Sequence, residues 1–377
     1  MTRLSELGEA HVLDRILTHQ RSGAQVIVGP GDDAAVTAPE GRLVSTADML
    51  VENEDFTREW LDWSRLGRKA AAQNLADVCA MGAKPHGLLV SLALPDDTDI
   101  ADLEALYTGI IAEAGRAGAE LGCQVPIIGG DLSSSGLVVV AITALGTVEE
   151  GPVGGGAEGN GRSPGALGAG PAVLRSGART GDGLYLAGTV GRAAAGLELL
   201  FAGLRPETAA PELAALIETQ LAPRPDYAAM LTLPAASAMI DVSDGLSTDL
   251  GRIAAASGVA VDLERAALQE LIAPLLPAAH HLVRSAPAGT GGAAADGGGA
   301  AAGTGSTGAT GEAARTPEEV ALRWVLDGGE DHGFVASAAD SVQPGVGWRR
   351  IGRIRTGRDV SLDGTPVPTS GFSHFGK

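Results

Sequence analysis

Apolar segments that end beside glycine and aspartate recur along this chain, and they constrain its fold more than any other feature. Three of them carry the pattern: Val26–Val28 before Gly29-Pro30-Gly31-Asp32-Asp33, Gln124–Ile128 before Gly129-Gly130-Asp131, and Ala238–Val242 with Asp241, Ser243 and Asp244. Glycine lets a backbone approach a ligand closely, and adjacent carboxylates repel each other unless something positive neutralises them. Each segment alone also fits a surface turn. Their repetition favours strands that deliver acids to one site.

The hydrophobic pattern between these segments predicts alternating helices and strands. Apolar spacing predicts helices over residues 4–20, 64–81 and 100–121, and strands over 42–46, 86–94, 124–128 and 137–145. The stretch 137–145 is apolar throughout, which predicts a strand buried on both faces. A later strand over 184–188 follows the loop that carries Arg175. The strand with Asp241 leads into a helix that stops at Gly258, and a last helix begins at Thr316-Pro317.

Length, composition and charge limit the classes of function. The 377 residues suffice for two domains, and the formal net charge of -19 argues against a basic nucleic-acid patch and against an anionic membrane surface. A divalent cation, or an anion bridged by one, is the partner that this charge favours, although acidity can also serve solubility alone. The two cysteines show no CxxC spacing, and no leader or membrane-length apolar run occurs, so we expect a cytoplasmic protein.

Two low-complexity stretches suggest the domain organisation. Residues 151–170 are rich in glycine, alanine and proline and predict a linker, and residues 285–315 predict a disordered insertion. We therefore expect an N-terminal domain over 1–150 and a C-terminal domain over 171–377.

Further acids and a hydroxyl occur at strand ends and on a helix face, where they could bind a hard cation. Thr46 and Asp48 follow a strand, Asn74 and Asp77 share one face of a helix, and Glu330 follows Gly328-Gly329. A solvated helix face is the alternative for Asp77, and an exposed loop arginine is the alternative for Arg175.

The chain lacks the motifs of several common enzyme classes. It has no GxxxxGK[ST] phosphate cradle, no GxSxG elbow and no HExxH zinc motif. What remains is a set of acids, half of them directly beside glycine: Asp32, Asp33, Asp48, Asp77, Asp131, Asp241, Asp244 and Glu330. Such acids converge at low cost only around metal ions, and Mg²⁺ held in this way can bind polyphosphate during phosphoryl transfer.

Seven motifs in order then point to a known family. GPGDDAAV, STADMLVE, NLADVCAMGAKP, IIGGDLSS, LRSGARTGD, IDVSDGLSTDL and LDGGED resemble the thiamine-monophosphate kinase family, within the aminoimidazole ribonucleotide synthetase-like superfamily. The resemblance covers nearly the whole chain outside the two low-complexity stretches. It implies an α/β (α+β) fold of two domains, each a mixed sheet packed with helices, and a homodimer formed through strands of the N-terminal domain. The implied reaction transfers the γ-phosphoryl group of ATP to thiamine monophosphate, with several Mg²⁺ ions.

The same resemblance implies roles for individual positions. Residues matching Mg²⁺ ligands are Asp33, Thr46, Asp48, Asp77, Asp131, Asp241 and Asp244. Residues matching ATP contacts are Gly130, Asp131, Arg175 and Ser243. Residues matching contacts to the thiamine substrate are Asp55, Glu330 and Phe372. No catalytic side chain is implied beyond positioning and metal assistance.

Three positions depart from the family pattern. Asp55 stands in place of a histidine, Ala47 in place of a threonine, and His332-Gly333-Phe334 in place of Tyr-Glu-Leu. Two alternatives therefore stay open. One is an ATP-dependent enzyme of the same superfamily with another acceptor, and the other is a catalytically silent protein that binds Mg²⁺ and nucleotide.

Overall fold

The structure is a computed structural model. It describes residues 2–7, 9–17, 23, 25–30, 33–150, 170–232, 235–285, 316–343, 345–368 and 371. The predicted linker, apart from residue 170, and the predicted disordered insertion, apart from residue 285, lie outside these residues. Gly31, Asp32 and Phe372 lie outside them as well.

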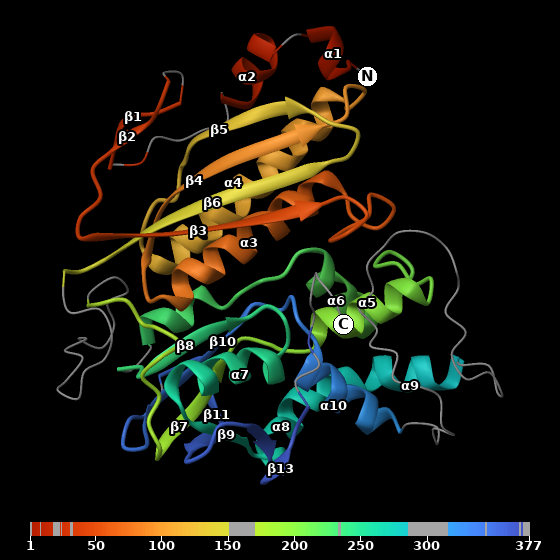
Figure 1. Ribbon diagram of the computed structural model, residues 1–377. Helices are drawn as coiled ribbons and strands as arrows, with labels where there is room; N and C mark the ends of the chain where they lie inside the picture. Colours follow the sequence, from red (N-terminus) through yellow and green to blue (C-terminus); the bar gives the residue numbers. More distant parts are fainter. Residues whose placement is uncertain are drawn as a thin grey trace.

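The N-terminal part of the chain builds a four-stranded sheet with helices on one face (Figure 1). Its strand order is β3-β6-β4-β5, with β4 and β5 parallel and the other pairs antiparallel. The strands are β3 (Arg42–Val51), β4 (Lys84–Leu94), β5 (Ile127–Ser134) and β6 (Val139–Val148), and the helices are α3 (Trp63–Ala80) and α4 (Ile100–Leu121). We call residues 33–150 the N-terminal half.

Helices α3 and α4 pack against each other unusually closely because each carries a glycine at the crossing. A Cβ atom on Gly67 would lie 2.1 Å from the carbonyl oxygen of Leu106, and one on Gly109 would lie 2.0 Å from that of Ser64. Asp62 caps the start of α3 by accepting a hydrogen bond from the amide of Arg65 at 2.8 Å. The two helices therefore pack closely together against one face of the sheet.

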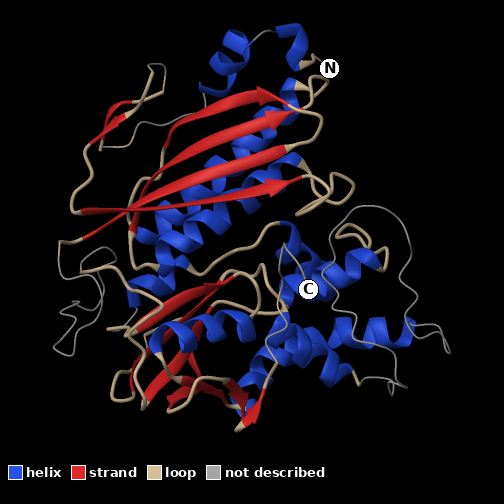
Figure 2. Ribbon diagram, viewed as in Figure 1, coloured by secondary structure: helices blue, strands red, loops and turns tan. Residues whose placement is uncertain are grey.

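No helix of the described residues lies on the opposite face of this sheet (Figure 2). The prediction that the 137–145 strand is buried on both faces is wrong, because burial alternates along β6 from residue to residue. On β3, the side chains of Leu43 and Met49 on this open face are 55% and 56% exposed. The continuous apolar pattern reflects one face packed on α3 and α4 and a second apolar face that no part of the described chain covers.

The C-terminal part of the chain, residues 170–368, builds a mixed seven-stranded sheet in the order β13-β12-β9-β11-β7-β10-β8. We call these residues the C-terminal half. Its strands are β7 (Asp182–Ala187), β8 (Ala238–Val242), β9 (Ala260–Leu263), β10 (Gly333–Ala339), β11 (Trp348–Arg355), β12 (Val360–Leu362) and β13 (Thr365–Pro366). Its α-helices are α5 (Arg192–Phe201), α6 (Pro211–Leu221), α7 (Leu246–Ser257), α8 (Arg265–Ile272), α9 (Leu276–Ser285) and α10 (Pro317–Asp327), with short 3-10 helices η1 (Tyr227–Thr232) and η2 (Ala273–Leu275). The α/β prediction with mixed sheets is confirmed.

Short elements precede the first sheet. They are α1 (Leu4–Leu7), α2 (Glu9–Leu17) and a hairpin of β1 (Val26–Val28) and β2 (Val36–Thr37). Figure 1 shows this hairpin well separated from β8 and α7. Within the part of the chain that the structure describes, no helix is both long enough and apolar enough to cross a membrane.

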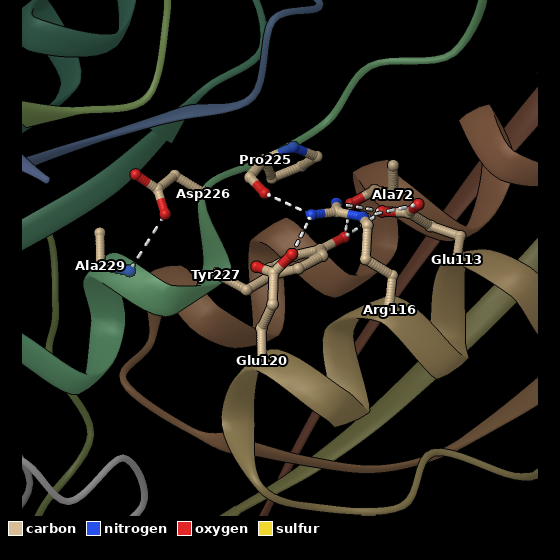
Figure 3. A network of polar contacts seen from close by, with 8 residues as sticks. All are labelled: Ala72, Glu113, Arg116, Glu120, Pro225, Asp226, Tyr227 and Ala229. Atoms are coloured by element: carbon tan, nitrogen blue, oxygen red, sulfur yellow. Dashed lines mark hydrogen bonds and ion pairs between the residues drawn. The ribbon is translucent and has the colours of Figure 1, made fainter.

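A buried polar network joins the two halves (Figure 3). Arg116 of α4 lies over the ring of Tyr227, 4.5 Å from its centroid, and donates to the carbonyl oxygen of Pro225 at 3.1 Å. The same guanidinium pairs with the buried carboxylate of Glu113, which also accepts from the hydroxyl of Tyr227 at 3.1 Å. Because a buried carboxylate is stable only with its partners in place, this network fixes α4 against η1.

Candidate functional site

The first side of the site is the contact between β3 and α3. The hydroxyl of Thr46 donates to the carboxylate of Asp77 at 2.6 Å, and the side chain of Asn74 accepts from the amide of Asp48 at 3.0 Å. Asn74 and Asp77 do share one helix face, as their spacing predicts. That face lies against the sheet, and Asp77 is only partly exposed, so the solvated alternative for Asp77 does not hold.

The second side is the connection between β8 and α7. Asp241 lies in β8 and is 3% exposed, and Asp244 lies just before α7. The carboxylate of Asp249, fully buried in the first turn of α7, accepts from the amides of Ser243 and Asp244, both at 3.1 Å. Arg252 then pairs with Asp249 and with Asp244, each at 2.5 Å. These contacts fix the carboxylate of Asp244 at the start of the helix.

The third side is the loop of residues 328–332, which we call the GGEDH loop. Its backbone runs along the end of β8: the amide of Glu330 donates to Ser243 at 2.9 Å and that of His332 to Val242 at 3.2 Å. A Cβ atom on Gly329 would lie 2.0 Å from the carbonyl oxygen of Ser243, so only glycine allows this approach. The approach brings the ring of His332 to Asp241, with 3.1 Å between Nδ1 and Oδ2.

The two halves bring their carboxylates into one electrostatic environment. We call Asp48, Asp77, Asp241 and Asp244 the carboxylate cluster. Burial, followed by repulsion from Asp241, raises the pKa of Asp77 from 3.8 to about 7, although the hydrogen bond from Thr46 opposes the rise. Burial and the charges of Asp241 and Asp244 also raise the pKa of Asp48, against the opposing effect of His332. Mutual repulsion of this kind is what a bound cation would relieve.

Other predicted site residues do not join this cluster within the described chain. The strand register aligns Asp131 of β5 with Ser91 of β4 and, through β6, with Met49 of β3. These three residues lie on the open face of the sheet. Thr46 and Asp48 point to the helix-covered face at the other edge. Asp131 thus lies three strands away from β3, roughly 14 Å at ordinary strand spacing.

Strand boundaries also differ from the prediction. We expected Asp48 and Asp131 at strand ends, but both lie inside longer strands, β3 and β5. Gly130 stays glycine for a packing reason, since its Cβ atom would lie 1.8 Å from the carbonyl oxygen of Val90.

The remaining predicted residues have separate positions. Asp33 is exposed in the segment between β1 and β2, and Arg175 is exposed in the loop before β7. The carboxylate of Asp55 accepts from the amide of Val51 at 2.8 Å, which closes the turn after β3. Glu330 lies beside the cluster in the GGEDH loop. Phe372 lies outside the described residues, and its neighbour Gly371 donates to the hydroxyl of Thr248 in α7 at 3.0 Å.

Sequence reasoning missed several polar residues that support the site: Lys69, Gln220, Asp249 and Arg252. It noted His332 only as a departure from the family pattern. The signal for Lys69 was present, because a lysine among Leu66, Ala70 and Leu75 on an apolar helix must find a buried partner. The signal for Asp249 was an acid in the first turn of a predicted helix. Nothing in the sequence pattern alone joins Gln220 to the site.

The donor set can be tested against Mg²⁺. Carboxylates and a hydroxyl are the oxygen ligands that this hard cation prefers. Among the residues that the structure describes, however, no three His, Cys, Asp or Glu side chains form a group that could hold a metal ion. Asp241 and Asp244 are instead bonded to His332 and Arg252. Since Mg²⁺ usually binds one or two carboxylates together with waters and substrate phosphates, the residues fit a site that a nucleotide completes.

Known proteins are similar to this chain over most of their length. A family model described as AIR synthase related protein, N-terminal domain, matches residues 31–148. The thiamine-monophosphate kinase of Mycobacterium tuberculosis (strain ATCC 25618 / H37Rv) is 38% identical over 384 residues, covering 99% of this chain and 93% of that protein.

Two solved structures extend the comparison. The thiamine-monophosphate kinase of Stenotrophomonas maltophilia K279a is 30% identical, with a TM-score of 0.69 over 94% of this chain and 97% of the other. The structure of AaThiL complexed with AMPPCP and TMP is 26% identical, with a TM-score of 0.64 over 100% and 99% of the two chains.

The two sheets and the carboxylate cluster between them define a protein of the AIR synthase-related fold. Within that class the chain belongs to the thiamine-monophosphate kinase family, since the similarity extends over nearly its full length.

Proposed function

We propose that this chain is a phosphotransferase that uses ATP to phosphorylate thiamine monophosphate to thiamine diphosphate. The observation that carries the proposal is the carboxylate cluster, assembled from both halves in a chain similar over its length to thiamine-monophosphate kinases. The structure of AaThiL complexed with AMPPCP and TMP supports the choice of both substrates.

The demands of the reaction agree with the residues present. The acceptor is a phosphate whose oxygens are already ionised at neutral pH, so no general base is needed, and alignment and charge neutralisation remain. Asp48, Asp77, Asp241 and Asp244 would hold Mg²⁺, with Thr46 orienting Asp77. Bound Mg²⁺ would neutralise charge on the transferring phosphoryl group. Asp249 and Arg252 keep Asp244 in place at the start of α7.

The two substrates would take different parts of the chain. We assign the nucleotide to Gly130, Asp131, Arg175 and Ser243, and the acceptor to Asp55, Glu330 and Phe372. The planar guanidinium of Arg175 suits a phosphate, and its exposure in the described structure leaves it accessible to one. Consumption of ATP suits a cytoplasmic location. We assign residues 1–150 to the first domain, 151–170 to the linker and 171–377 to the second domain.

A homodimer would explain the positions of Asp131 and Asp33. Asp131 lies on the uncovered apolar face of the four-stranded sheet, and Ile27 and Val36 of the β1–β2 hairpin are 67% and 48% exposed. Packing two copies through this face would bury Leu43 and Met49 and would bring Asp131, and with the exposed hairpin Asp33, against the partner's N-terminal half. Each active site would then need residues from both copies.

Mixing two inactive variants tests this arrangement. Asp131→Asn and Asp241→Asn subunits, each inactive alone, should recover about a quarter of wild-type activity after mixing and subunit exchange, since half of the dimers are hybrids with one intact site. Sedimentation should show a dimer. A Met49→Asp variant that stays fully active as a monomer would contradict the shared site.

The function itself is tested by product formation. ADP and thiamine diphosphate should appear only when ATP, thiamine monophosphate and Mg²⁺ are all present, and chelation of Mg²⁺ should abolish turnover. ATP binding without turnover would favour a silent nucleotide-binding protein. Turnover with another phosphate or carboxylate acceptor, but not with thiamine monophosphate, would favour a different enzyme of the superfamily.

A further inference from the structure

Lys69 is a buried cation in α3 whose partners come from the other half of the chain. Its side chain is 2% exposed, and its Nζ atom lies 3.0 Å from the carbonyl oxygen of Gln220 and 3.1 Å from Oε1 of Glu330. Gln220 lies in the last turn of α6, and Glu330 lies in the GGEDH loop. One ammonium group thus connects the helix that carries Asp77 to two elements of the C-terminal half.

The carboxylate of Glu330 is held at both oxygens. Lys69 binds Oε1, and the side-chain amide of Gln220 donates to Oε2 at 2.5 Å. To make this bond, Gln220 leaves its own buried Oε1 atom without a hydrogen-bond partner among the described residues. The side chain of Glu330 is 37% exposed. Its orientation is therefore fixed by these two contacts while solvent can still reach it.

The GGEDH loop needs such anchors because its backbone is strained. Glu330 and His332 have φ values of +66° and +53°, in the left-handed region that residues other than glycine rarely adopt. Asp331 between them is anchored to the hydroxyl of Thr189 at 2.8 Å and to the amide of Ala193 at 2.9 Å. His332 then meets Asp241. The side chains of Glu330, Asp331 and His332 therefore stabilise a backbone conformation that is unfavourable by itself.

We propose that Lys69 is a positioning residue: by binding Glu330 from across the contact between the halves, it holds the GGEDH loop in the conformation that sets His332 against Asp241. Lys69 contacts no member of the carboxylate cluster through a hydrogen bond or ion pair within the described residues, so it acts through the loop. The inference uses the proposed phosphoryl transfer only as one of its readouts.

The first test is a double-mutant cycle. Lys69→Met keeps the apolar stem and removes the charge, and it should lower kcat/KM for thiamine monophosphate about 10- to 100-fold, because small displacements of site groups cost that much. Glu330→Gln should have a comparable effect, and the double variant should be no worse than the poorer single variant. Arg68→Met is the matched control, since Arg68 is the neighbouring cation and forms no ion pair with any described residue. It should stay within about twofold of wild type.

The second test does not depend on activity. In protein labelled with ¹⁵N-histidine, the His332 ring signals are identified by their loss in His332→Gln. These signals should shift in Lys69→Met and stay unchanged in Arg68→Met. If Lys69→Met fails to fold, Gln220→Met removes the second anchor of Glu330 and should shift the same signals.

Two results would overturn the inference: unchanged His332 signals in the folded Lys69 and Gln220 variants, or effects of Lys69→Met and Glu330→Gln that simply add. A wild-type protein that does not phosphorylate thiamine monophosphate would instead refute the proposed function, while the histidine signals would still decide the role of Lys69.

Discussion

Asp241→Asn is expected to lower kcat/KM at least about 100-fold while the protein stays folded. Asp241 is buried where β8 meets the GGEDH loop, and its charge acts on both Asp48 and Asp77 of the other half. Asparagine has nearly the same shape and can still accept a hydrogen bond from His332. The change therefore removes one negative charge from the cluster and little else. Steady-state kinetics with ATP and thiamine monophosphate measure the loss.

Asp340→Asn is the control for this change. Asp340 is an exposed acid of the same half that directly follows β10, at the end opposite the GGEDH loop, and pairs with Arg350 at 2.5 Å. Its replacement should leave turnover unchanged, because an exposed ion pair contributes little. Near-normal turnover in Asp241→Asn, with circular dichroism and thermal unfolding like wild type, would rule out the carboxylate cluster as the reacting centre.

Asp77→Asn should have opposite effects on stability and activity. Burial and the charge of Asp241 raise the pKa of Asp77 from 3.8 to about 7. A raised pKa means that the folded state binds this proton more tightly than the unfolded state. The stabilisation is complete below about pH 4 and is lost as the pH rises toward 7. Without divalent cations at pH 8, the free energy of unfolding should therefore rise by roughly 2 kcal/mol in the variant, after allowance for solvent screening.

Activity should fall about 100-fold in the same variant, since it lacks one of the proposed Mg²⁺ ligands. Denaturant unfolding at pH 5 and pH 8, with and without Mg²⁺, separates the two effects. Mg²⁺ should stabilise the wild type more than the variant. Asp97→Asn, an exposed acid of the same half, should change neither quantity. A variant that is less stable than wild type at pH 8 would show that Asp77 is not under repulsion in the folded protein.

Local patterns in the sequence were sufficient to predict most helices and strands and several residues of the carboxylate cluster. The apolar strand that ends in Asp241, Ser243, Asp244 and Gly245 pointed to both aspartates, and the three-residue spacing of Asn74 and Asp77 pointed to a shared helix face that the structure confirms. These features depend on neighbours in the chain, which a sequence displays directly. The same holds for the capping box at Thr316, where the side chain accepts from the amide of Glu319.

Features that depend on distant partners could not be read in this way. The apolar run of β6 looked like a strand buried on both faces, because nothing in the residues tells a covered face from an apolar face left open. The register that sends Asp131 to one face of the sheet and Asp48 to the other depends on strand pairing. Glu330 was predicted as a site residue and Lys69 was not, and their pairing needs the contact between the halves.

That contact also has a consequence for the order in which the chain folds. The four-stranded sheet and its two helices end at Val148, so they can form while the rest of the chain is still being synthesised. At that stage the carboxylate of Glu113 lacks Tyr227, which lies 114 residues further along. The ammonium of Lys69 likewise awaits Gln220, 151 residues away, and Glu330 beyond it. An early intermediate would keep two poorly paired charges near water. The last step of folding, which brings α6, η1 and the GGEDH loop against α3 and α4, would then complete the core and the active site together.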